Sequence, residues 1–179
     1  EGTDISAVLD GSTVTFSAPE NFNGSELFTA TVTDDDLTDS KSFVVTIGPV
    51  NDAPIANAAS GETVEDQSVV IVLSGSDIDG DNLTFTLASD AVNGTATLDG
   101  ALATYTPNAN YNGDDSFTFS VSDGEYSSSA DVSISVSAVN DAPILASISD
   151  VSFDEDGSGS TSLSADDVDG DSLEFSISG

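Results

Sequence analysis

The residues of this chain that can do chemistry are almost all carboxylates. Its 179 residues include 33 Asp plus Glu against a single Lys or Arg, with no His and no Cys. Without Cys or His there is no disulfide, no thiolate or imidazole metal ligand and no imidazole base. With one basic residue, the chain also lacks the side chains that bind a phosphate backbone. The composition therefore excludes zinc chemistry, most nucleophilic catalysis and nucleic-acid binding.

The acids recur in short motifs at a constant spacing. The link Val50-Asn51-Asp52-Ala53-Pro54-Ile55 returns about 90 residues later around Asn140-Asp141. The same spacing relates a DxDGD run and an earlier Glu-Asp pair to their second copies. The runs are Asp77, Asp79 and Asp81 with Asp167, Asp169 and Asp171, and the pairs are Glu65-Asp66 with Glu155-Asp156.

This self-similarity predicts one complete repeat, residues 49–138, between two half repeats. Residues 1–48 match the second half of a repeat and residues 139–179 match the first half. Joining Gly179 to Glu1 would continue the repeat without a gap. We therefore expect a two-repeat unit of a longer array, in which neighbouring copies complete the two halves head to tail, possibly as a filament.

The segments that position the acids are predicted to be short β-strands. Runs rich in Val, Ile, Thr and Phe alternate apolar with polar residues and are separated by Asn, Gly, Asp or Pro turns. The sequence predicts an all-β fold of tandem seven-stranded antiparallel sandwiches joined end to end. No run of 18 apolar residues exists, so no membrane span is predicted. The expected strands are one near Ile55 and others at 68–73, 83–87, 95–98, 103–106, 116–121 and 131–136.

Strands that alternate in direction bring the acids to the ends of each repeat. The turn 61–67, the loop 108–115 and the link at Asn140-Asp141 fall at one end. The loops 77–82 and 123–124 fall at the other end, beside Asn51-Asp52. We call these the first junction (around Asn51-Asp52) and the second junction (around Asn140-Asp141). The second is expected to gather Glu65, Asp66, Asp114, Asp115, Asn140, Asp141, Asp167 and Asp169.

A cluster of this kind requires cations. Six carboxylates about 6 Å apart would repel one another by on the order of 10 kcal/mol in water before screening. Oxygen-only ligands in large number favour Ca²⁺ over Mg²⁺, which demands a stricter octahedron. The calcium loop of a helix-loop-helix hand does not fit, because that loop needs Gly at its sixth position and Glu at its twelfth. In the loop that begins at Asp77, the glycine is Gly80, at the fourth position, and the twelfth residue is Ala88. Solvated Asp-Gly turns and a general acid excess suited to brine remain open alternatives.

The motifs resemble the cadherin-like tandem repeats of giant secreted bacterial adhesins, often of the RTX type, and related surface proteins. The resemblance covers the whole chain and implies calcium bound between successive domains, with adhesion, biofilm or filament roles outside the cell or at its surface. The ligands it implies are Asn51, Asp52, Glu65, Asp66, Asp77, Asp79, Asn140, Asp141, Glu155, Asp156, Asp167 and Asp169, with Asp114-Asp115 at the acidic motif before the sixth strand. Further candidates are Asp81, Asp171, Asp123 and, at the place of Asp115 in the first half repeat, Glu26.

Two other functions could use the same residue types. Paired carboxylates can hydrolyse glycosides, but their recurrence in every repeat argues for a structural role, so no enzyme is expected. Tyr105, Tyr111 and Tyr126 could stack on a sugar. The alternative function is therefore a calcium-dependent carbohydrate-binding module of a polysaccharide-degrading system, with a glycan or cell-surface ligand as its partner.

Overall fold

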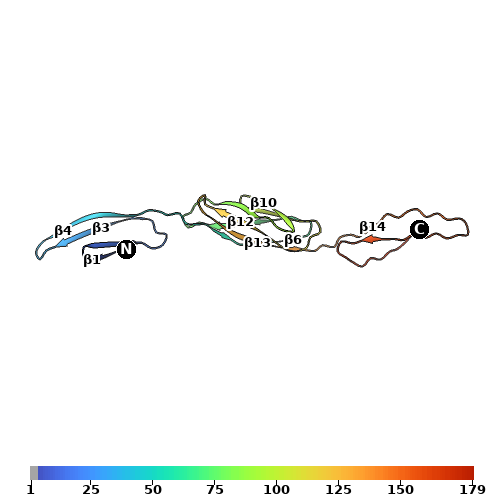
Figure 1. Ribbon diagram of the computed structural model, residues 1–179, viewed down its shortest axis with the longest axis horizontal. Coiled ribbons are helices and arrows are strands. Elements are labelled where there is room, and N and C mark those ends of the chain that lie inside the picture. The colour runs from blue at the N-terminus through green and yellow to red at the C-terminus, as the bar shows by residue number, and fades with distance from the viewer. Residues whose placement is uncertain (1–3) are drawn as a thin grey trace.

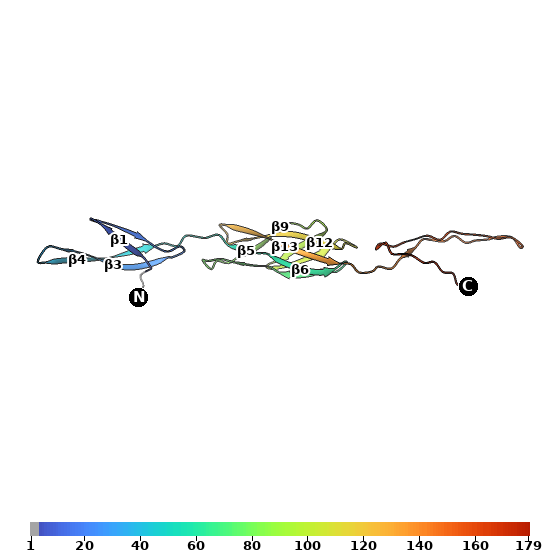
Figure 2. The ribbon, with the colours of Figure 1, turned by 90° about the horizontal axis from the view of Figure 1, so that it is seen from below.

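The molecule is a row of three β-rich segments joined by extended links (Figures 1 and 2). The computed structural model describes residues 4–179, and within them every regular element is a strand. The predicted all-β class is confirmed. None of the described residues forms a helix that is long and apolar enough to cross a membrane.

The middle segment is a complete two-sheet sandwich. Its larger sheet has the order β6-β13-β12-β9 and its smaller sheet the order β10-β11-β7, with a further pair between β5 and β8. The strands are β5 (Ile55–Asn57), β6 (Ala59–Val64), β7 (Val69–Val72), β8 (Ser74–Ser76), β9 (Thr84–Ser89), β10 (Gly94–Asp99), β11 (Leu102–Pro107), β12 (Gly113–Ser122) and β13 (Ser127–Ser137).

The core lies between these two sheets because alternate side chains of each strand point inward. On β12, Phe117, Phe119 and Val121 are buried, and the residues between them are partly exposed. On the smaller sheet, Ala103 and Tyr105 of β11 are fully buried. Burial of each large apolar side chain contributes roughly 1.5–3 kcal/mol. The strand ends, and with them the acidic loops, are therefore held on a rigid body.

The predicted first strand is wrong in its extent and in its pairing. The chain forms two strands there, β5 and β6, and Gly61 to Val64 belong to β6 instead of the predicted turn. β5 pairs antiparallel with β8, whereas β6 pairs parallel with β13, so the sandwich is not wholly antiparallel. Near Ala58 the chain passes from the β5-β8 pair to the larger sheet, where β6 covers the edge of β13 and protects it from pairing with other chains. The tight turn is confined to Glu65 to Gln67, where the Gln67 amide donates to the Val64 carbonyl at 3.3 Å.

The two outer segments contain the same strands in complementary subsets. The N-terminal segment has two hairpins at the positions of β10-β11 and β12-β13, and the C-terminal segment has one short pair at the position of β5-β8. The N-terminal segment thus has two strands of each sheet, and neither outer segment contains a complete sandwich. The hairpin strands are β1 (Ser6–Asp10), β2 (Thr13–Ser17), β3 (Gly24–Thr33) and β4 (Thr38–Ile47), and the short pair is β14 (Ile144–Leu145) with β15 (Ala165–Asp166).

Candidate functional site

At the first junction, the link lies against the loop between β8 and β9. The Asp52 amide donates to Oδ2 of Asp79 at 2.8 Å. The Asn51 side-chain amide donates to Oδ2 of Asp123 at 3.0 Å. The predicted positions of the loop 77–82 and of Asp123 beside this link are therefore confirmed.

The DxDGD loop is closed by its own first carboxylate. Oδ1 of Asp77 accepts the amides of Asp79 at 2.9 Å and Asp81 at 3.4 Å, a turn typical of Asp followed by Gly. Gly80 takes a φ of 81°, which a residue with a side chain rarely adopts. This leaves Oδ2 of Asp77 buried without a hydrogen-bond partner.

The second junction repeats this arrangement one repeat later. The Asp141 amide donates to Oδ2 of Asp169 at 2.7 Å. Oδ1 of Asp167 accepts the amides of Asp169 at 3.1 Å and Asp171 at 3.2 Å. Here the carboxylate oxygen that is buried without a partner is Oδ2 of Asp141.

Carboxylates from two parts of the chain act on Asp141, which lies in the link between them. Burial raises the pKa of Asp141, and the negative charges of four neighbours raise it further. The neighbours, from the largest effect, are Asp169, Asp66, Glu65 and Asp167. They come from the complete repeat and from the segment that follows the link. The second junction is therefore a site where unneutralised negative charge accumulates.

The turn after β6 fastens the complete repeat to the second link. Glu65 is only 3% exposed, and its Oε1 accepts the Val139 amide. Asp66 has a φ of 61°, and its Oδ1 accepts the Asn110 amide at 3.1 Å. A residue other than Gly or Asn in this backbone region is uncommon, and Asp156, at the matching position, repeats it with a φ of 65°.

Glu26 and Asp115, both predicted to lie at junctions, cap a β-strand instead. Oδ2 of Asp115 accepts the Asn93 amide and the Tyr105 hydroxyl, each at 2.9 Å. Burial acts to raise the pKa of Asp115, but several backbone amides and the Tyr105 hydroxyl outweigh it and hold the pKa below its ordinary value. Oε1 of Glu26 likewise accepts the Asp4 amide at 2.6 Å and the Ile5 amide at 3.2 Å. Both side chains thus hold the segment that leads into a hairpin, ahead of β10 and β1.

Asp114, which was predicted at the second junction, lies apart from it, and Glu155 and Asp156 lie in the turn of the following segment, where the repeat predicted them. Asp114 is exposed on β12, beside the surface formed by Gly61 and Glu62. Glu155 and Asp156 are exposed in the segment between β14 and β15, which extends away from the second junction (Figure 1). Hydrogen bonds within residues 4–179 include none to these three side chains.

Two asparagines that were not singled out in the sequence belong to the junctions. Asn110 lines a pocket with Asp141 and Asp167, and Asn21 lines one with Asp52 and Asp77. Asn21 and Asn110 have φ values of 61° and 56°. They occupy the same repeat position, so their recurrence is a signal that could have identified them.

The donor set fits a hard cation, although the oxygens are not gathered around one point. Within residues 4–179, no group of three or more acidic side chains is already arranged to hold a metal ion. Several of the carboxylates accept backbone amides instead, and one oxygen each of Asp77, Asp141 and Glu26 stays buried and unpartnered. Such an oxygen is costly to bury, and a cation at that place would satisfy it. Oxygen-only donors suit Ca²⁺.

One family model matches less than half of the chain, and the match lies within the complete repeat. Residues 51–135 match the family model described as the bacterial Ig domain. No curated protein matches the chain.

Solved structures show only a distant likeness. Drosophila N-cadherin EC1-4 is 14% identical with a TM-score of 0.46. The alignment covers 80% of this chain and 48% of the N-cadherin chain. The endo-fucoidan hydrolase MfFcnA4, from glycoside hydrolase family 107, is 21% identical with a TM-score of 0.40, covering 78% of this chain. This chain spans 23% of that hydrolase's length. The surface layer protein SbsC, domains 1–6, is 18% identical with a TM-score of 0.34, covering 88% of this chain and 22% of its own.

At these TM-scores the likenesses carry no argument about function. The family match agrees with the two-sheet sandwich of the complete repeat. Bacterial Ig domains are typically non-catalytic and are commonly extracellular or surface-associated. Residues 51–135, within the complete repeat, are therefore similar in sequence to the bacterial Ig domain and fold as a two-sheet β-sandwich.

Proposed function

We propose that the chain is a spacer of a long extracellular repeat protein, stiffened by calcium at its junctions, that serves adhesion, biofilm or surface-filament architecture. The observation that carries this proposal is the second junction. Burial and the charges of four carboxylates, from the complete repeat and from the segment after the link, raise the pKa of Asp141 in the link. One oxygen of Asp141 is also buried without a hydrogen-bond partner.

The residues would hold the ion from three separate bodies. Glu65 and Asp66 end a strand of the sandwich, Asp141 belongs to the link, and Asp167 and Asp169 belong to the next segment. A bound Ca²⁺ supplies positive charge and accepts about six to eight oxygen ligands. Because the ligands sit on three bodies, holding one ion would set the angle between neighbouring repeats. A bendable link would become part of a rod.

The test is the distance distribution across the second junction. The chain contains no Cys, so spin labels can be placed on the exposed residues Thr97 and Ser152 through a double Cys variant. We expect a broad distribution in EGTA and a narrow one in calcium at about 10⁻³ M, the range typical of extracellular calcium modules. The same distribution in both solutions would overturn the proposal.

A matched pair of variants separates binding from total charge. Asp167→Asn removes a carboxylate of the cluster, whereas Asp154→Asn removes an exposed carboxylate of the same segment outside it. Only Asp167→Asn should raise the calcium concentration needed to narrow the distance distribution. An equal shift in both variants would mean that calcium acts by general screening.

The alternative, a carbohydrate-binding module, would need an exposed aromatic platform. Tyr105 is fully buried, and Tyr126 is 46% exposed. Within residues 4–179 no other aromatic ring packs on Tyr126. We therefore retain the spacer as the proposed function, and calcium-dependent binding to a glycan array would favour the alternative.

A further inference from the structure

The second link is held by its backbone amides from two sides. On one side, the Val139 amide donates to Oε1 of Glu65 in the complete repeat. On the other side, the Asp141 amide donates to Oδ2 of Asp169 in the following segment, at 2.7 Å. Between them, no group of residues 4–179 accepts the backbone amide of Asn140. The link thus has two bound amides on either side of a free one.

The Glu65 side chain takes the place of a hydrogen bond of the β6-β13 ladder. These strands pair parallel as far as Val64 and Ser137, and the Glu65 amide then donates to the Ser137 carbonyl at 2.9 Å. If the parallel ladder continued, the Val139 amide would donate to the Glu65 carbonyl. The chain turns away at Asp66, which has a φ of 61°. The Glu65 carboxylate accepts that amide instead and carries the ladder into the link.

Burial stabilises this contact. Glu65 is only 3% exposed. A buried carboxylate without a hydrogen-bond donor is costly, so separation of Glu65 from Val139 is unfavourable. The chain should therefore move with the complete repeat as far as the Val139 amide.

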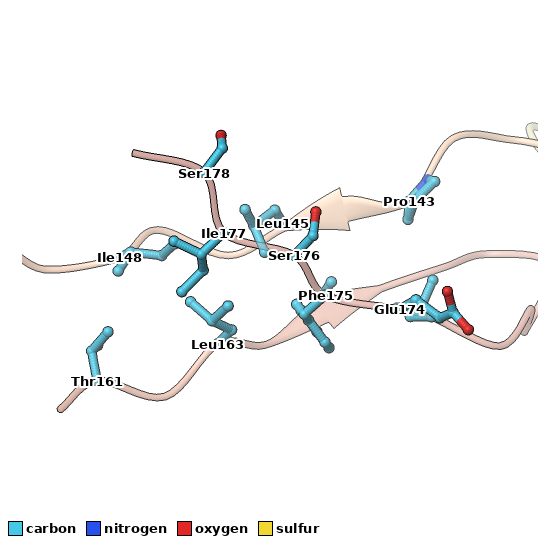
Figure 3. Close-up of a pocket in the computed structure, with 12 residues that line it drawn as sticks. Pro143, Leu145, Ile148, Thr161, Leu163, Glu174, Phe175, Ser176, Ile177 and Ser178 are labelled. Carbon is cyan, nitrogen blue, oxygen red and sulfur yellow. The ribbon is translucent and has the colours of Figure 1, made fainter.

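The chain after the link belongs to the following segment. Asp169 is fixed there, because its own amide donates within the DxDGD loop at 3.1 Å. Two residues beyond Asp141, β14 begins its pairing with β15. Pro143 lines a largely apolar pocket of about 570 Å³ with Phe175 (Figure 3). From Asp141 onward, the chain is part of a second body.

The contact with the DxDGD loop recurs at the first junction. There the Asp52 amide donates to Oδ2 of Asp79 at 2.8 Å. Asp79 belongs to the complete repeat, in which both sheets are present. The contact is therefore a feature of the repeat and does not depend on the smaller C-terminal segment.

We propose that Glu65 and Asp169 are the positioning residues of the second junction and confine its bending to Val139 and Asn140. The dihedral angles that lie between the two bound amides are those of these two residues alone. Each contact uses one oxygen of its carboxylate and requires no ion. The arrangement is therefore present before any cation binds and is separate from the calcium proposal.

Hydrogen exchange in EGTA, measured by NMR, tests both contacts in the unchanged chain. Relative to their intrinsic rates, the amides of Val139 and Asp141 should exchange about tenfold or more slowly than the Asn140 amide, as expected for hydrogen bonds to charged acceptors. Equal protection of the three amides would overturn the inference.

Glu65→Ala removes the first contact. Protection of the Val139 amide should fall by about tenfold or more, while that of Asp141 is unchanged. Glu65→Gln keeps an oxygen acceptor and should restore most of the protection. The matched control is Glu62→Ala, which removes an exposed acid of the same strand whose side chain has no hydrogen bond within residues 4–179. Unchanged protection in Glu65→Ala, or an equal loss in Glu62→Ala, would contradict the assignment of Glu65.

Asp169→Ala removes the second contact and should produce the reverse result. Protection of the Asp141 amide should fall by about tenfold or more, while that of Val139 stays. Asp171→Ala is the control, because among the described residues nothing donates to the Asp171 side chain. A loss at Val139 in Asp169→Ala would mean that the two contacts are not independent holds.

A proline substitution tests where the junction bends. With spin labels on Thr97 and Ser152 in EGTA, Asn140→Pro should narrow the distance distribution, because proline fixes its own φ and restricts the residue before it. It removes no backbone hydrogen bond that the link makes. Ala142→Pro, within the second body, should leave the width unchanged.

An Asn140→Pro distribution as broad as the original, or equal narrowing by Ala142→Pro, would show that the bending lies elsewhere. Because all these measurements are made in EGTA, their failure leaves the calcium proposal untouched. Conversely, a junction that does not respond to calcium would still show the exchange pattern of Val139, Asn140 and Asp141.

Discussion

The two junctions share one arrangement but differ in the carboxylates around it. In both, the link's Asp amide donates to the second Asp of the DxDGD loop, at 2.8 Å in the first and 2.7 Å in the second. Within the described residues, Glu65 and Asp66 of the complete repeat lie beside the second link. Asp123 of the same repeat lies beside the first link, where it accepts a hydrogen bond from the Asn51 side chain. The acids before the link, and not the DxDGD loop alone, thus crowd the second junction with negative charge.

The largest expected effect tests whether Asp115 is a ligand of the second junction. Asp115→Ala should lower the free energy of unfolding of the complete repeat by about 3 kcal/mol, because the buried Tyr105 hydroxyl and two backbone amides lose a charged acceptor. Chemical denaturation measures this loss. The midpoint of calcium binding at either junction should not move. A weaker calcium affinity at the second junction would instead make Asp115 a ligand.

The next effect separates the two junctions directly. Glu65→Gln keeps an acceptor for the Val139 amide but removes a buried charge. Calcium affinity at the second junction should fall by about tenfold or more, since affinity follows the charge of the ligands, while the first junction is unchanged. The backbone amide signals of Asp141 and Asp52 in a calcium titration report the two sites separately.

Glu26→Gln is the matched control for Glu65→Gln. Glu26 also accepts backbone amides with one oxygen, but it does so at the start of β1. Its loss of charge should leave both calcium midpoints in place. A shift at the first junction would show that Glu26 is a ligand there, as the sequence predicted.

A smaller effect tests the hydrogen bond between Asn51 and Asp123 at the first junction. Asn51→Ala removes the hydrogen bond to Asp123 and should cost about 1 kcal/mol of local stability. Hydrogen exchange of the amides near Asp52 measures it. Asn140→Ala should cost less, because the Asn140 side chain donates only to the Asp141 carbonyl, at 3.0 Å.

The smallest effect is a difference in titration between the junctions. Backbone amides of Glu125 and Tyr126 hold the pKa of Asp123 below its ordinary value, despite some burial. Burial and neighbouring charges raise the pKa of Asp141. As the pH falls, Asp141 should therefore take up its proton before Asp123, and carboxyl carbon shifts measured by NMR in EGTA would show this order.

Asp141 and Asp123 also change the stability of the fold in opposite directions as the pH falls. Protonated Asp141 relieves repulsion, so its stabilising effect is present below its unfolded pKa and is lost as the pH rises through the raised folded pKa. Asp123 stabilises above its unfolded pKa, and that effect is lost as the pH falls through the lowered folded pKa. Coincident titrations would contradict the environments described for both groups.

Much of the fold could be predicted from the sequence because strand and turn signals are local. Alternation on β12 and β13 and the turns between them were enough to predict those strands, and strand direction placed Asp79 and Asp123 beside the first link. The switch of the first strand between two sheets was missed. Its parallel pairing with β13 depends on a strand far along the chain, and no local pattern encodes it.

The candidate site, like the fold, could be predicted from the sequence only in part. The sequence by itself determined the all-β class, the repeat and the ends of the repeat at which the acids gather, since these follow from residue spacing and the two-residue period of a strand. Only the tertiary structure decided which oxygens face one another. It directs Asp115 and Glu26 onto backbone amides and buries Glu65 against the second link, because the direction of a side chain at a strand end depends on the neighbouring segments that pack there.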